Sequence, residues 1–316
     1  MPTRTTLPLL ALILSCASAC SGNEPAGPAG PPNASAALPA PTASAPPAPS
    51  ASATAQRGPL GGEGACGGLS CTVFATPADA FAAVLATRPR MLAIGETHAQ
   101  KGTEGVESAT SRFTKQLLPK LAGLSTDIVL ELWIADGKCG KKEQQAAAAQ
   151  KPVTESQAST NQNEFVTLGN ATKALGIQPH VLRPTCEEYD RIVGAGDNSV
   201  DEMLTMIARK TEAMTRQLVS RDDKLVLAYG GAMHNDLVPA AGRAPWSFGP
   251  QMREATGGKY VELDIIVREY VRDTDSWKSL PWYPHFDRAK FPDKALLYSP
   301  SPQSYVLVFP SSASSG

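Results

Sequence analysis

The stretch Met91-Leu-Ala-Ile-Gly-Glu-Thr-His98 decides the predicted fold. Its first five residues are apolar or small, which is typical of a strand buried on both faces, as in a parallel sheet. Polar residues follow at once, and apolar residues then recur at helical spacing over residues 106–121. The stretch therefore predicts a strand, a polar loop and a helix in succession.

The same alternation continues to the end of the chain and predicts an α/β domain with a largely parallel sheet flanked by helices. The C-terminal runs 295–298 and 305–309 predict an antiparallel hairpin at a sheet edge. Further strands are expected at 127–133, 178–183, 224–229 and 259–267, and further helices at 76–86, 165–175, 200–218 and 251–255.

The first 63 residues differ from the rest in composition. Of the 27 prolines 12 fall within residues 1–60, and the first aromatic residue is Phe74. Such sequence lacks the apolar area that would offset the entropy of ordering the chain. We therefore expect a signal peptide over 1–20, a Pro/Ala/Ser-rich disordered tether over 21–63 and a single α/β domain over 64–312.

The N-terminus has the features of an export signal. An apolar run of about eight residues follows Arg4, too short to span a bilayer as a helix. Ile13-Leu-Ser-Cys16 and Ala17-Ser-Ala-Cys20 both resemble the lipobox of bacterial lipoproteins, and Cys20 is favoured because an even number of cysteines then remains. Cleavage after Ala19 without lipidation is the alternative. We expect an exported protein, lipid-anchored to the periplasmic or cell-surface face of a bacterial membrane.

Charge and motif content exclude several functions. The formal net charge is −1, with 29 basic and 30 acidic residues, so no cationic face for nucleic acid is expected. The sequence contains no His-Glu-x-x-His, Gly-x-Ser-x-Gly or phosphate-loop motif. The cysteines lack the spacing of a zinc finger or a thioredoxin-like site.

Residues 136–163 are too long for an ordinary connection and form a low-complexity insertion. They are interpreted either as a disordered surface insertion or as a lid over a site. Four cysteines allow three pairings, of which we favour Cys66 with Cys71 and Cys139 with Cys186. The second bridge would hold the insertion at the rim of a cleft.

Titratable residues fall at or near the ends of four predicted strands, where clefts of parallel sheets lie. The motif Gly-x-x-His occurs twice, at Gly95–His98 and Gly231–His234, and glycine lets the backbone leave a strand sharply. We expect convergence of five residues: Glu96, His98, Glu131, Arg183 and His234.

Each of these residues also has a structural interpretation. Glu131 interrupts a buried strand and could form an ion pair with Arg183. His98 and His234 could cap loop carbonyls. Glu262 and Asp264 are expected to face solvent on an edge strand.

The paired motifs and the strand glutamate resemble a superfamily that unites ChaN haem-binding lipoproteins, erythromycin esterases and TIKI/TraB proteins. The resemblance covers about residues 91–267. It implies an α/β fold with paired Gly-x-x-His loops at one site. It also implies one of three activities: metal-dependent proteolysis, lactone hydrolysis at a Glu/His site, or haem binding by a membrane lipoprotein.

Two functions follow as hypotheses. In a hydrolase of an ester, lactone or peptide bond, His98, Glu131 and His234 hold a divalent metal or form a metal-free acid/base site. Glu96 or His98 is then the general base, and Arg183 stabilises the oxyanion. In a binding protein the same cleft takes haem, and its aromatic contacts come from Trp133, Trp246 or Tyr229.

Overall fold

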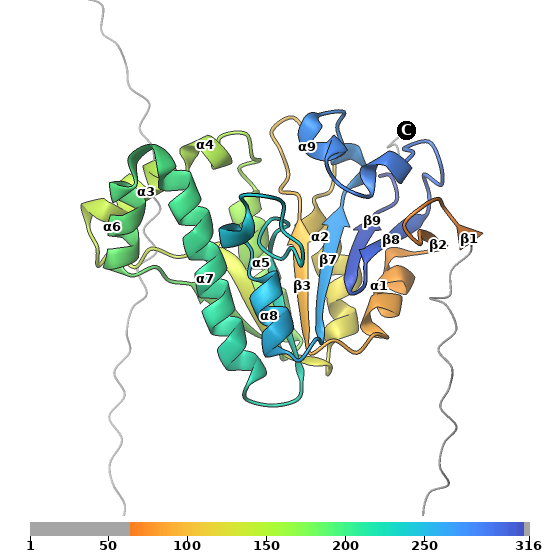
Figure 1. Cartoon of the computed structure of the whole chain (residues 1–316), viewed down its shortest axis with the longest axis horizontal. Helices are drawn as coiled ribbons and strands as arrows, with labels where there is room; N and C mark the ends of the chain where they lie inside the picture. Colours follow the sequence, from red (N-terminus) through yellow and green to blue (C-terminus); the bar gives the residue numbers. More distant parts are fainter. Residues whose placement is uncertain (1–63, 313–316) are drawn as a thin grey trace, which may run out of the picture. The chain divides into compact units, whose positions relative to one another are not determined.

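The strand β3 (Met91–Glu96) lies inside a sheet to which the described part of the chain contributes nine strands, and it has a parallel strand on either side. This computed structural model describes residues 64–312 (Figure 1). All six side-chain positions of β3 are buried. Burial of both faces confirms the interpretation of the apolar run that opens the motif.

The strand order is β1-β2-β8-β9-β7-β3-β6-β4-β5. The pairs from β9 to β5 are parallel, and those among β1, β2, β8 and β9 are antiparallel. The mostly parallel sheet confirms the predicted fold class. The bounds are β1 Gly64–Ala65, β2 Thr72–Phe74, β4 Ser125–Trp133, β5 Gln178–Leu182, β6 Leu225–Gly231, β7 Tyr260–Ile266, β8 Ala295–Ser301 and β9 Ser304–Val308.

Helices cover both faces of the sheet. One face packs on α1, α5 and the α2 region, and the other on α6, α7 and α8, the last two lying in front of the sheet in Figure 1. The α-helices are α1 Pro77–Leu85, α2 Ala109–Arg112, α3 Lys141–Ala149, α4 Lys151–Thr154, α5 Asn161–Ala174, α6 Cys186–Gly194, α7 Ser199–Val219, α8 Gly249–Ala255 and α9 Asp275–Lys278. The short helices are η1 Phe113–Leu117, η2 Leu118–Leu121, η3 Gly196–Asn198, η4 Ala244–Trp246, η5 Arg268–Tyr270 and η6 Tyr283–His285.

The C-terminal hairpin of β8 and β9 is antiparallel, as predicted, but it does not form the edge of the sheet. β9 pairs in parallel with β7, and β8 pairs with β2, which in turn pairs with β1. The disulfide Cys66–Cys71 closes the turn between β1 and β2. Two short strands that the sequence analysis did not predict therefore occupy this edge.

Segment 136–163 is largely helical. It contains α3, α4 and the start of α5. The disulfide Cys139–Cys186 joins a cysteine two residues ahead of α3 to the first residue of α6, and it confirms the favoured pairing. The segment is thus anchored to the helix that follows β5.

Within residues 64–312 no helix is both long and apolar enough to cross a membrane. The expected signal peptide, the tether and Cys20 lie outside the described residues.

Candidate functional site

A cavity of about 510 Å³ opens beyond the carboxyl ends of β3, β4 and β6. Its size is in the range of small-molecule sites. Four of the five predicted site residues line it: Glu96, His98, Glu131 and His234. Its apolar wall includes Leu132, Trp133, Val153, Phe165, Leu182, Met203, Leu204 and Ile207. Segment 136–163 supplies part of the wall: Gln150, Val153, Thr154, Gln157, Asn161 and Gln162.

The register between β3 and β6 brings the two Gly-x-x-His motifs together. Gly95 is the Cα partner of Gly230, and Glu96 is the partner of Gly231. Because both strands run in parallel and end at the same level, each motif turns away from the sheet beside the other. The chain order of the strands had not revealed that β3 and β6 are neighbours.

Glu96 and His98 form the first carboxylate–imidazole pair. His98 Nδ1 lies 2.7 Å from Glu96 Oε1, and Thr110 Oγ1 donates to Glu96 Oε2 at 3.0 Å. Glu96 is only 3% exposed, whereas the His98 side chain is 23% exposed and borders the cavity. Thr110, at the start of α2, is a site residue that the sequence analysis missed, since a helical threonine carries no distinctive pattern.

The pair favours a charged His98 ring. Burial opposes the charge, but the hydrogen bond with Glu96 and the negative charges of Glu96 and Glu131 outweigh it, and together they raise the pKa of His98 to about 9. His98 is therefore an imidazolium near neutral pH. A protonated ring can donate a hydrogen bond or a proton from Nε2, but it cannot ligate a metal.

The raised pKa of His98 predicts a pH-dependent stability. A folded-state pKa above the unfolded value contributes stability that is complete below about pH 6.5 and is lost as the pH rises through about 9. The contribution is at most about 3 kcal/mol at low pH. We expect the difference in unfolding free energy between wild type and His98→Gln, measured in urea, to shrink between about pH 6 and pH 10. A difference that stays constant with pH would contradict the assigned protonation.

Glu131 and His234 form the second pair. The Gly231 N–H donates to Glu131 Oε2 at 2.6 Å, and Glu131 Oε1 lies 3.6 Å from His234 Nε2. His234 is 3% exposed, and its Nδ1 donates to the Trp246 carbonyl oxygen at 2.7 Å. A hydrogen on Nδ1 leaves Nε2 of the neutral ring as the atom that carries the lone pair. Glu131 thus faces His234 and not Arg183.

The two pairs meet beside Gly231. A Cβ atom built on this glycine would lie 3.4 Å from His98 Nε2, 3.6 Å from Glu131 Oε2 and 3.9 Å from His234 Cδ2. The His98 imidazolium and the Glu131 carboxylate can therefore both contact a molecule bound beside Gly231. A second space of about 10 Å³, lined by Glu131, His234 and Asn235 among others, has room for about one water molecule.

The predicted metal set of His98, Glu131 and His234 is not assembled in the described residues. The one group in residues 64–312 with three candidate ligand atoms within 4.8 Å of one another consists of Asp236, Glu262 and Asp264. Each ring uses Nδ1 for its hydrogen bond, His98 with Glu96 and His234 with the Trp246 carbonyl group.

Arg183 does not join the site. It is exposed, it does not line the cavity, and the carboxylate it acts on is that of Asp136. β5, which ends at Leu182, is the outermost strand on its side of the sheet, two strands away from β6. The expected oxyanion role of Arg183 therefore has no support in the geometry.

The three aromatic residues predicted to contact a ligand differ in whether they line the cavity. Trp133 lines the cavity, stacks on Tyr189 at 5.5 Å between ring centroids and donates to its hydroxyl at 2.8 Å. Tyr229 is 2% exposed and does not line this cavity, and burial raises its pKa well above the usual value. Trp246 contributes its carbonyl group to His234 and does not line the cavity. Trp133 is thus the one predicted aromatic contact that borders the cavity.

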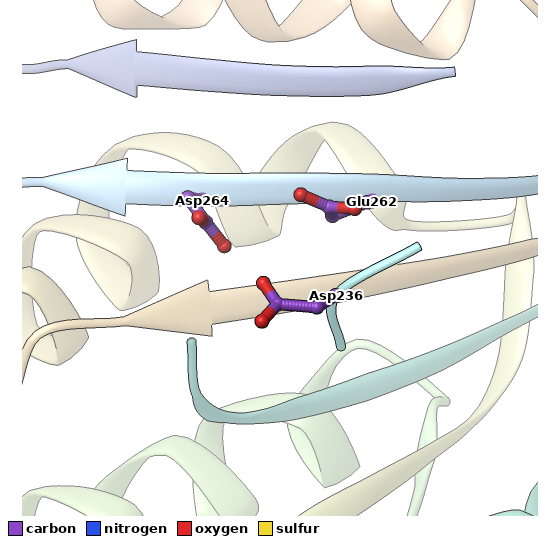
Figure 2. Close-up of side chains that lie close together, drawn as sticks. All are labelled: Asp236, Glu262 and Asp264. Carbon is purple, nitrogen blue, oxygen red and sulfur yellow. The ribbon is translucent and has the colours of Figure 1, made fainter. Parts of the chain in front are cut away.

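Glu262 and Asp264 do not lie on an edge strand. β7 lies between β9 and β3, and both side chains project from one face of β7 toward Asp236, which follows β6 (Figure 2). Burial and the charge of Glu262 raise the pKa of Asp236 to about 7, although Arg243 opposes the shift. Burial also raises the pKa values of Glu262 and Asp264. Glu262 and Asp264 were expected to face solvent because the order of the strands in the sheet could not be predicted from the sequence.

Comparison with known proteins gives structural likeness only. No family profile and no curated protein matches the chain. Solved structures with a similar arrangement include the type III effector HopBA1, with a TM-score of 0.39 and 10% identity over 75% of this chain and 94% of that one. An erythromycin esterase, EreC, in its open conformation has a TM-score of 0.40 and 8% identity over 72% and 92%.

ChaN of Campylobacter jejuni, whose structure shows cofacial haem binding, has a TM-score of 0.34 and 12% identity over 72% of this chain and 90% of that one. Two of these three proteins belong to the groups that the Gly-x-x-His motifs resemble. TM-scores of 0.34 to 0.40 describe a likeness in general arrangement, and no residue role is transferred from it.

Proposed function

We propose that this protein is a hydrolase that cleaves an ester or lactone bond of a small molecule by metal-free acid/base catalysis. The observation that carries the proposal is the meeting of two carboxylate–imidazole pairs in one cavity of about 510 Å³. Carboxylate and imidazole groups that meet in one cleft are typical of acid/base sites.

The second pair would activate water. Glu131 Oε1 and His234 Nε2 lie 3.6 Å apart, so one water molecule can contact both. Either group can take a proton from that water as it attacks the carbonyl carbon of the substrate. Their hydrogen bonds to Gly231 and Trp246 hold both groups in position.

The first pair would stabilise the oxyanion and the leaving group. The His98 imidazolium can donate a hydrogen bond from Nε2 to the oxygen that becomes negative. It can then give its proton to the departing alkoxide, which leaves as an alcohol, while the substrate carbonyl ends as a carboxylic acid. Glu96, both of whose oxygens are engaged, keeps His98 charged and oriented and is a positioning residue instead of the expected general base.

The cavity favours a substrate that is partly apolar. Trp133, Phe165 and Met203 provide flat or flexible apolar contacts in the cavity that the two pairs line. Amide-bearing side chains at Gln157 and Asn161 supply polar contacts on the wall formed by segment 136–163. A small ester or lactone with a hydrophobic body fits this distribution better than an extended peptide.

The proposal is tested by supplying the full-length protein with a panel of aryl esters, aliphatic esters and macrocyclic and small lactones. We expect hydrolysis of at least one class, with a rate that falls as the pH rises through about 9, where His98 loses its proton. If no member of the panel is hydrolysed between about pH 6 and pH 9, the proposed activity is wrong.

Haem binding is the second candidate, because the apolar wall could take a flat hydrophobic ligand. The charged His98 cannot ligate iron, and Tyr229 does not reach the cavity, so His234 and a deprotonated His98 are the available ligands. Titration of the full-length protein with haem would give a Soret band whose intensity rises above about pH 9. Absence of a Soret shift at any pH would exclude this reading.

We further propose that the chain is exported and lipid-anchored through Cys20, which lies outside the described residues. Two disulfides suit an oxidising compartment. Labelling with radioactive palmitate in a bacterial host is expected to mark the wild type and Cys16→Ser but not Cys20→Ser. Loss of label in Cys16→Ser alone would move the modified cysteine to position 16.

A further inference from the structure

Three carboxyl groups outside the cavity lie close enough together to share one ion. Oxygens of Asp236, Glu262 and Asp264 are all within 4.8 Å of one another. Calcium binds oxygen at 2.3–2.6 Å, so ligands on opposite sides of the ion are at most about 5 Å apart. Figure 2 shows Glu262 and Asp264 on one face of β7, with Asp236 reaching toward them from the segment that follows β6.

A fourth oxygen lies beside this group without a partner. The Asn235 side chain is 2% exposed, and its Oδ1 has no hydrogen bond within the described residues, while its Nδ2 donates to Asp264 Oδ1 at 3.1 Å. A Cβ built on Gly95 would lie 2.6 Å from Asn235 Oδ1 and 2.5 Å from Asp264 Oδ1. Both oxygens therefore point into the same space over β3. A buried carbonyl oxygen without a donor is costly unless something fills its lone pairs.

The negative charge of this group is poorly compensated. Leu237 N–H and Ser304 Oγ donate to Glu262 at 2.6 and 3.0 Å, but no hydrogen-bond donor of residues 64–312 reaches the Asp236 carboxylate. The exposed Arg243 exerts a positive influence on Asp236, but it does not prevent the raised pKa of that carboxyl group. Three neighbouring carboxyl groups must either keep protons or hold a cation.

We propose that Asp236, Glu262 and Asp264, together with the Asn235 amide oxygen, bind one hard divalent cation of the Ca²⁺ or Mn²⁺ type. The donor set consists of oxygens alone, which such ions prefer over the nitrogen and sulfur ligands typical of zinc. Asp236 and Asp264 are partly exposed, so the ion can enter from solvent and complete its coordination with water.

The cation would fix the segment that carries His234. Residues 235–237 already dock on β7 through three hydrogen bonds. The Tyr260 hydroxyl donates to the Asn235 carbonyl oxygen at 2.6 Å, Asn235 Nδ2 donates to Asp264, and Leu237 N–H donates to Glu262. An ion held between Asp236 and the two carboxylates of β7 adds a fourth connection. The proposed site lies outside the large cavity and stands whether or not the cavity is catalytic.

Calorimetric titration of the chelator-treated full-length protein with CaCl₂ or MnCl₂ alone tests the proposal. We expect one Ca²⁺ or Mn²⁺ per chain with a Kd of about 1 mM or tighter, and a higher melting temperature in its presence.

Asp264→Asn and Asp236→Asn are each expected to weaken binding at least about tenfold. The matched control is Asp293→Asn, which removes an exposed carboxylate outside the group and should bind as the wild type does. The second variant keeps the test decisive if one of the two does not fold. Either of two results overturns the proposal: no binding of either ion at about 5 mM, or wild-type affinity in both variants.

Discussion

Replacement of Glu131 with Gln is expected to lower kcat for ester or lactone hydrolysis by about 10²- to 10⁴-fold. The amide keeps an oxygen that can accept from the Gly231 N–H, so the strand end should retain its shape. It loses the negative charge that faces His234 Nε2 at 3.6 Å and with it the capacity to accept a proton from water. KM should change little, because Glu131 contributes one oxygen to a cavity with many other contacts.

The matched control for this variant is Glu254→Gln, which neutralises an exposed glutamate in α8. It should leave kcat and the melting temperature near the wild-type values. An unchanged kcat in Glu131→Gln, with hydrolysis established for the wild type, would remove Glu131 from the mechanism and leave His234 as the base.

Replacement of Gly95 with Ala is expected to lower the free energy of unfolding by about 3 kcal/mol. The added methyl would lie 2.7 Å from the Ala232 Cα atom and closer still to Asp264 Oδ1 and Asn235 Oδ1. Side chains can rotate away, but Ala232 belongs to the turn after β6, so the backbone must move. Denaturation in urea measures the loss.

Two other glycines give this prediction its controls. Gly105→Ala places a methyl where no atom lies within 4 Å, and its effect should stay within about 0.5 kcal/mol. At Gly231 the nearest atom would be His98 Nε2 at 3.4 Å, so Gly231→Ala should fold but hinder a substrate from lying between His98 and Glu131. Equal stability of Gly95→Ala and Gly105→Ala would show that the turn after β6 yields easily.

The strands and the two Gly-x-x-His motifs could be predicted because they depend on local pattern. An apolar run with a glycine at its end identifies β3, and periodic apolar residues identify α7. The sequence indicated that Gly95 matters for the backbone, but not the reason. The absence of a side chain lets the turn after β6 pack closely against β3, and the φ of Gly95 is not in the left-handed region.

The order of the strands in the sheet could not be predicted from the sequence. The wrong predictions for Arg183, Glu262 and Asp264 follow from this. The four strand ends were expected to lie together in chain order, whereas β6 lies between β3 and β4 and leaves β5 outermost. Arg183 therefore lies away from the cavity, while Glu262 and Asp264 lie in an interior strand. Such pairings depend on how whole faces of helices and strands pack, and a single sequence carries little information about that.

The protonation of His98 was likewise not predictable. Burial opposes the charge on the ring, and the hydrogen bond and charge of Glu96 together with the charge of Glu131 outweigh it. Glu96 is near in sequence, but Glu131 and the burial of the ring depend on the whole fold. The prediction that His98 would hold a metal took no account of this charge, and it stays a prediction.

The disulfide between Cys139 and Cys186 has a kinetic consequence. It anchors the start of α3 to α6, and the chain that follows α3 forms one wall of the cavity through Gln150, Val153 and Gln157. With the bridge intact, this wall can open only as far as its anchored end allows. Ligand residence times are therefore expected to be longer in the oxidised protein, so that ligand dissociation depends on the thiol–disulfide balance of the surroundings.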